Sequence, residues 1–170
     1  MWRSTTHWLW TSRLRPVGLK PRDASQAIRV CLAISCLLIG SAVYIIFRPT
    51  SLLMFHWAEF LGLAPVVGAA RSLWPGGATQ PPGWLVYSLP FALWVASYLF
   101  LVHAIWRRSQ SLSRHVWFWC IPVASVASEL LQGAHVIPGT FDPVDVLVIV
   151  VATLCVLVVE ESIKSEEGQS

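Results

Sequence analysis

The stretch Ser128-Glu129-Leu130-Leu131-Gln132, followed after a short gap by Asp142-Pro143-Val144-Asp145, decides how this chain is expected to fold. It places carboxylate and amide groups at the ends of two segments that are otherwise apolar enough for a lipid bilayer. Ionisable groups are costly in such segments, so each one there is a functional-site candidate. The stretch therefore predicts two membrane-spanning helices with polar ends.

The composition favours the same class of protein. Hydrophobic residues make up 55% of the 170 residues and charged residues 12%, against roughly 25% charged residues in an average soluble domain. The mean hydropathy is +0.61. Many of the ten tryptophans lie near the ends of apolar runs, where their amphipathic rings favour the headgroup region. The net charge of +3 is small, and no basic, aromatic surface pattern indicates a nucleic-acid partner.

Four apolar runs are expected to span the membrane, at about 27–47, 84–106, 115–132 and 144–159. The first is interpreted as a retained anchor, because it is longer than the apolar core of a signal peptide and no small-residue cleavage site follows it. The fourth is rich in β-branched residues, but a segment in lipid must satisfy its own backbone, so a helix is expected. The predicted fold class is all-α, an integral membrane four-helix bundle with an additional outer interfacial helix. The predicted divisions are a cytoplasmic segment 1–26, a transmembrane domain 27–160 and a cytoplasmic tail 161–170.

The basic residues predict the orientation. Most of them precede the first run or lie between the second and third, whereas only Arg48 and Arg71 lie on the opposite side. The positive-inside rule then places both termini in the cytoplasm, in a membrane expected to be the bacterial cytoplasmic membrane. Segment 51–70 is apolar but interrupted, and is expected to lie in the outer interface, with a re-entrant loop as the alternative. The acidic end, 160–170, is expected to fray.

Polar residues form a stripe on the third predicted helix. Ser125, Ser128, Glu129 and Gln132 stand at i, i+3, i+4 and i+7, which places them on one helix face. Lipid cannot satisfy such groups, so the stripe should face other helices or a wet cavity that opens outward. Interhelical hydrogen bonding is the alternative interpretation.

The start of the fourth helix has a local explanation. Asp142 is a good N-cap, and proline suits the first helical position that follows it. Asp145 is less explained by capping and is expected to point toward Glu129, so that the carboxylates form an acidic cluster. Arg48 or Arg71 could pair with this cluster or hold a lipid phosphate, the alternative being two interfacial anchors.

Other reactive residues carry no motif. His56, Glu59 and His135 match no tight metal-binding spacing, so neither a metal nor a cofactor is predicted. The four cysteines all fall within apolar runs without a Cys-x-x-Cys pair. They are interpreted as small buried apolar residues rather than as disulfides or zinc ligands.

The two motifs at 128–132 and 142–146, together with Leu89-Pro90-Phe91-Ala92-Leu93-Trp94, resemble the signature of VanZ-like membrane proteins. Those proteins carry a Glu-x-x-Gln on one helix and an Asp-rich start to the next. The chain departs from the family pattern at Ile149 and Ala152, where an Asn and a Gly are usual. The resemblance covers residues of about 85–154. It implies a multi-span cell-envelope protein and a link to glycopeptide antibiotic resistance.

The leading functional hypothesis is binding at an outward-facing polar site. Its expected ligands are membrane lipids, a lipid-linked envelope precursor or a membrane protein partner. One alternative is a membrane enzyme that uses carboxylate acid/base chemistry on an envelope lipid, which needs carboxylates that converge on an open cavity. The other is a scaffold or assembly subunit, in which Glu129 would be paired in a closed interface.

Overall fold

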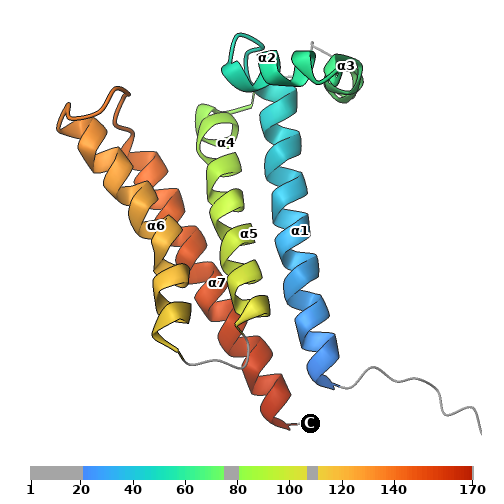
Figure 1. The fold of residues 1–170 in the computed structure, drawn as a ribbon, viewed down its shortest axis with the longest axis vertical. Coiled ribbons are helices and arrows are strands. Elements are labelled where there is room, and N and C mark those ends of the chain that lie inside the picture. Colours follow the sequence, from blue (N-terminus) through green and yellow to red (C-terminus); the bar gives the residue numbers. More distant parts are fainter. Residues whose placement is uncertain (1–20, 75–80, 107–110, 170) are drawn as a thin grey trace, which may run out of the picture.

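The computed structural model describes residues 21–74, 81–106 and 111–169, and all regular secondary structure in these ranges is helical (Figure 1). The all-α prediction is therefore confirmed. The helices are α1 (Pro21–Phe47), α2 (Leu53–Phe60), α3 (Ala64–Ser72), α4 (Gly83–Tyr87), α5 (Leu89–Ile105), α6 (Leu112–Gly133) and α7 (Pro143–Gln169).

The long helices α1, α5, α6 and α7 run along the molecule in alternating directions (Figure 1). Helix α5 packs against α1, α6 and α7, and α6 also packs against α7. The two short helices α2 and α3 lie across the end of α1, close to the start of α4 (Figure 1). Segment 51–70 thus forms two helices, where one was expected, and they do not descend between the long helices.

Two of these helices are long and apolar enough to cross a membrane. The qualifying segments are Ala24–Phe47 in α1 and Pro143–Gly168 in α7, and α5 is a shorter apolar helix. Helix α7 continues ten residues beyond the predicted end at 159, so the expectation that 160–170 would fray is wrong as far as Gln169. The physical reason is packing, because Glu160 and Ile163 are buried, with 1% and 8% of their surface exposed.

The second predicted span is divided at Ser88 into α4 and α5. Pro90 lies two residues after the break. Proline has no N–H to donate, and its ring clashes with the carbonyl group four residues earlier, which interrupts a continuous helix. Ser88 is buried and its carbonyl oxygen accepts the N–H of Ala92 at 3.1 Å, so α5 begins directly after the break.

The core lies where α5 meets its neighbours. It is built from apolar side chains of all four long helices, including Ala33, Val95, Leu99, Phe118 and Val156. The cysteine prediction is wrong in one respect. Cys31, Cys120 and Cys155 are exposed and Cys36 is half-buried, although all four are free. The outward faces of α1, α6 and α7 are themselves apolar, so an apolar position in this chain does not imply burial.

Candidate functional site

A cavity of about 300 Å³ lies where the end of α1 meets α4, the start of α5, the end of α6 and the start of α7. It is at the same end of the molecule as α2 and α3 (Figure 1). Its polar lining consists of five of the residues predicted from the sequence: Arg48, Ser128, Glu129, Gln132 and Asp145. The tertiary structure therefore brings the end of the first long helix to the two acidic motifs.

On the acidic side of the cavity, carboxylates accept hydrogen bonds from backbone N–H groups at the start of α7. Glu129 is 8% exposed, and its Oε2 accepts the N–H of Asp142 at 3.4 Å. The Oδ1 atom of Asp142 in turn accepts the N–H of Val144 at 2.8 Å, so Asp142 is the N-cap that the sequence predicted. Asp142 does not line the cavity. Its role here is to begin α7 and to hold its backbone against Glu129.

Gln132 is held by the turn between α6 and α7. Its Nε2 lies 3.5 Å from the Ser128 Oγ. On its other side is Gly139, where an added Cβ would overlap the amide of Gln132. Gly139 also has a φ of +146°, a conformation that side-chain-bearing residues rarely adopt. Only glycine satisfies both conditions at this position.

The basic side of the cavity is formed by Arg48. Its guanidinium carbon lies 5.4 Å from the ring centroid of Tyr44 and 4.6 Å from that of Tyr87. Its Nε is buried without a hydrogen-bond partner in the described part of the chain, and the same is true of Oδ1 of Asp145. No ion pair of Arg48 with a carboxylate occurs among the described residues. Two opposite charges thus line one cavity without contacting each other.

Two other predicted residues lie outside the cavity. Ser125 is buried one turn before Glu129 on α6. Arg71, on α3, donates to the backbone carbonyl of Arg48 and lies over the ring of Phe55, 5.0 Å from its centroid. Arg71 is therefore placed to position Arg48 rather than to contact a ligand in this cavity.

Arg71 lines a second cavity, between α2 and α3, together with His56 and Glu59. His135 lies on the turn after α6. Within the described ranges, no group of three or more His, Cys, Asp or Glu side chains could hold a metal ion.

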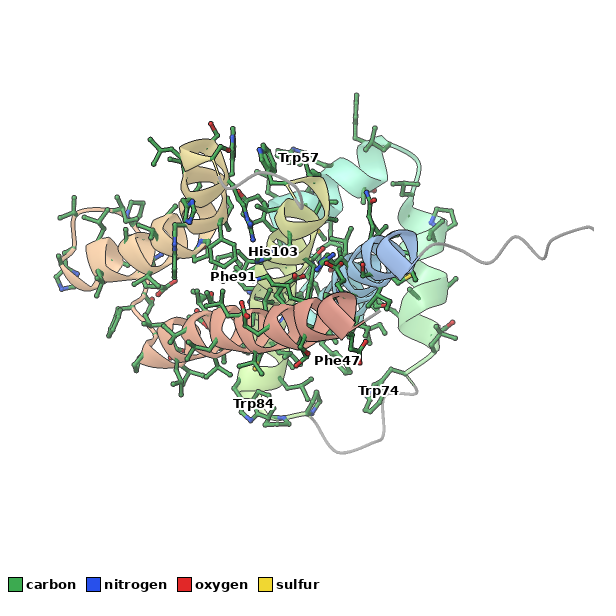
Figure 2. The ribbon with its side chains drawn as sticks, turned by 90° about the horizontal axis from the view of Figure 1, so that it is seen from below. Phe47, Trp57, Trp74, Trp84, Phe91 and His103 are labelled. Atoms are coloured by element: carbon green, nitrogen blue, oxygen red, sulfur yellow. The ribbon has the colours of Figure 1, made fainter. Side chains whose placement is uncertain are left out.

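The sequence analysis missed the aromatic part of the lining, which comprises Tyr44, Tyr87, Phe91 and Trp94. A signal was present. Tyr87, Phe91 and Trp94 are spaced i, i+4 and i+7, which is one helix face, and Tyr44 lies one turn before Arg48. Figure 2 shows Phe91 among the long helices, whereas Trp74 and Trp84 lie at the edge of the molecule.

A neighbouring face of α6 borders an apolar cavity of about 400 Å³ that it shares with α7. Its lining includes Val126, Leu130, Val150 and Leu154. Leu130 is the direct neighbour of Glu129, so one helix end borders both a charged cavity and an apolar one. Such a pairing of surfaces suits an amphipathic ligand.

A buried ionic network near the other end of the long helices was also missed. The Arg29 Nε of α1 donates to both carboxylate oxygens of Glu160 on α7, at 3.1 and 2.9 Å. These two side chains are 2% and 1% exposed. The Arg29 Nη1 reaches Glu167 at 3.0 Å, and Ser25 also donates to that carboxylate. The network therefore joins α1 to the part of α7 that was expected to fray.

His103 extends this network to α5 and α6. Its Nδ1 lies 3.7 Å from Glu160 Oε2 and 3.1 Å from a guanidinium nitrogen of Arg114. Arg29 is the one charged residue in the first apolar run, and a charge there requires a partner. Its partner is 131 residues away, and the sequence offers no means of identifying it.

No protein-family model, curated protein or solved structure matches this chain.

Proposed function

We propose that this protein is an integral membrane protein that binds the polar headgroup of an envelope lipid, or of a lipid-linked precursor, in the cavity between Arg48 and Asp145. One observation carries the proposal: the cavity is lined by a cation and two carboxylates, and Arg48 and Asp145 each have a buried polar atom that finds no partner within residues 21–74, 81–106 and 111–169. Unpaired buried polar atoms are costly. A ligand with matching charges would satisfy them.

The membrane part of the proposal assigns four spans to α1, α4–α5, α6 and α7, with α2 and α3 in the outer interface. It is supported by the two helices that meet the length and hydropathy criteria for a span. It is also supported by the many large apolar side chains exposed on the long helices, because a soluble surface rarely carries so extensive an apolar area. The positive-inside rule gives cytoplasmic termini, and the cavity then faces outward.

This topology has a direct test. Reporter fusions at the C-terminus and in the turn 134–141 should report opposite sides of the membrane, with the C-terminus in the cytoplasm. The same side for both fusions would contradict the four-span arrangement. A cytoplasmic turn with an external C-terminus would contradict the outward-facing cavity.

The resemblance to VanZ-like proteins stays a prediction that rests on the motifs at 128–132 and 142–146. A membrane enzyme is the second candidate function, because two carboxylates, Glu129 and Asp145, line the same cavity. In an enzyme one of them would transfer a proton to or from the bound lipid. A modified lipid released by the wild type, and not by Glu129→Gln, would favour that candidate.

The binding function is tested by mass spectrometry of the lipids that co-purify with the full-length protein. The wild type should retain a defined lipid class, and Glu129→Gln should lose it, because the neutral amide removes a charge from the lining. Glu161→Gln is the matched control, since Glu161 makes the same chemical change at a side chain that is 75% exposed on α7. Identical lipid profiles for wild type and Glu129→Gln would contradict the proposal.

A further inference from the structure

We infer that the headgroup bound in this cavity is zwitterionic, with its phosphate at Arg48 and its ammonium group at Asp145. The inference rests on the proposed lipid-binding function and names the class of lipid. It follows from the charges that line the cavity and from which of them already have partners.

Arg48 is arranged to receive an anion. The rings of Tyr44 and Tyr87 lie beside its guanidinium group, and Arg71 donates to its backbone carbonyl oxygen. These contacts leave the guanidinium charge without a counter-ion in the described part of the chain. Arginine binds phosphate through parallel hydrogen bonds from its planar group. A phosphodiester would give Arg48 the anion that it lacks.

Asp145 is the group left to receive a cation. Glu129, the other carboxylate, already accepts the backbone N–H of Asp142, whereas the buried Oδ1 of Asp145 accepts none. The aromatic lining adds ring faces that attract a cation, and Tyr44 and Trp94 lie with their ring centroids 5.3 Å apart. An ammonium group would therefore have both a carboxylate and aromatic faces to contact.

Ligands of a single charge fit this lining less well. A simple anion would bind Arg48 but would lie near two carboxylates. A simple cation would bind Asp145 but would lie near the guanidinium group of Arg48. The volume of about 300 Å³ is at the lower end of the roughly 300–1,000 Å³ range for ligand pockets. It has room for a small headgroup rather than for a whole lipid, so the acyl chains would lie outside it.

The test measures lipid binding to the delipidated full-length protein in detergent, by native mass spectrometry. The probes are phosphatidylethanolamine, which carries both charges, phosphatidylglycerol, which lacks the ammonium group, and a long-chain primary amine, which lacks the phosphate. The wild type should bind phosphatidylethanolamine at least about tenfold more tightly than either of the others, because each charge-assisted contact contributes roughly a factor of ten or more.

Two variants separate the two charges. Arg48→Gln should weaken binding of both phospholipids, whereas Asp145→Asn should weaken phosphatidylethanolamine about tenfold and leave phosphatidylglycerol unchanged or tighter. Lys164→Gln and Glu161→Gln are the matched controls, because both side chains are exposed, 43% and 75% respectively. Soluble phosphoethanolamine is a further arm. If it competes only weakly with phosphatidylethanolamine, the result supports a lipid as the ligand. Full displacement of phosphatidylethanolamine by an equimolar concentration would overturn the choice of a lipid.

The remaining outcomes distinguish this inference from the proposed function. If both phospholipids bind the wild type equally and both are lost in Glu129→Gln, the zwitterion inference is wrong and lipid binding stands. If no lipid binds the wild type better than it binds Glu129→Gln, both the zwitterion inference and the proposed lipid-binding function are wrong. If Arg48→Gln and Asp145→Asn lower the thermal stability, the double variant restores it and lipid binding never changes, the two residues are a structural ion pair and the inference is overturned.

Discussion

Single residues in the turn between α6 and α7 decide how the acidic side of the cavity is built. The side chain of Asp142 accepts the N–H of Val144 in the first turn of α7, and the backbone N–H of Asp142 donates to Glu129. Gly139 allows the turn to lie against Gln132. Neither residue lines the cavity, yet both hold residues that do.

Asp142→Ala should lower the free energy of unfolding by about 1 kcal/mol, because the N-cap hydrogen bond is lost. Asp142→Asn is the control, since its amide oxygen can accept the same N–H group. Thermal unfolding of the purified proteins in detergent measures both. Equal stability of the alanine variant and the wild type would show that the cap contributes nothing.

Gly139→Ala should cost about 1–3 kcal/mol through backbone strain and should also reduce lipid retention, because the new methyl group displaces Gln132. Combining it with Gln132→Ala removes the overlap but not the strain. The double variant should therefore be more stable than the sum of the two single effects predicts. Strict additivity would show that Gly139 and Gln132 do not interact.

At the scale of elements, small residues set how closely α1 approaches α5. A Cβ at Gly40 would lie 3.0 Å from the carbonyl oxygen of Pro90 and 3.0 Å from the Trp94 Nε1. The hydroxyl of Ser97 donates to the carbonyl of Ala33 at 2.7 Å, and Trp94 donates to Ser41 at 3.3 Å. Close backbone approach of this kind is how helices associate in lipid. It also positions Tyr44 and Arg48 opposite Asp145.

Gly40→Ala should destabilise the protein, because neither the Pro90 backbone nor the Trp94 ring can move without disturbing α5. Gly68→Ala on α3 is the matched control, since a Cβ there has open space. In a helix, replacing glycine by alanine stabilises by about 0.5–1 kcal/mol when nothing is in the way. In thermal unfolding, Gly40→Ala is expected to lower the stability relative to the wild type and Gly68→Ala to raise it. The same sign for both would contradict the packing argument.

At the scale of the whole molecule, the two polar clusters are of different kinds. In the cavity at one end, Arg48 and Asp145 each have a buried polar atom without a partner among the described residues, whereas the Arg29–Glu160 cluster carries charges that are paired and buried. The paired cluster joins α1 to α7, and through His103 it reaches α5 and Arg114 of α6. The paired cluster therefore connects all four long helices.

Arg29→Met should destabilise by about 3–5 kcal/mol, because it leaves the buried carboxylate of Glu160 without its guanidinium partner. Glu160→Leu should cost less, because Arg29 keeps its contact with Glu167. The double variant should cost less than Arg29→Met alone, since two apolar side chains replace the pair. Lys164→Met and Glu161→Leu, at an exposed pair on α7, should change stability little. A double variant as unstable as the sum of the two singles would contradict this pairing.

The sequence by itself determined the helices and part of the site. The apolar runs predicted the positions of the long helices. The polar stripe predicted three of the cavity residues, Ser128, Glu129 and Gln132, and the expectation that Asp145 points toward Glu129 predicted a fourth on the next helix. These features depend on neighbours within about two turns, which are visible as spacing along the chain.

Only the tertiary structure decided which distant residues meet. It brought Arg48, Tyr44 and Tyr87 to the acidic motifs, and it paired Arg29 with Glu160, which kept α7 helical where local composition indicated fraying. It also left three apolar cysteines on the outer surface. The physical reason is that both faces of these helices are apolar. Hydrophobic periodicity then no longer indicates which face packs inward, and the long-range contacts decide it.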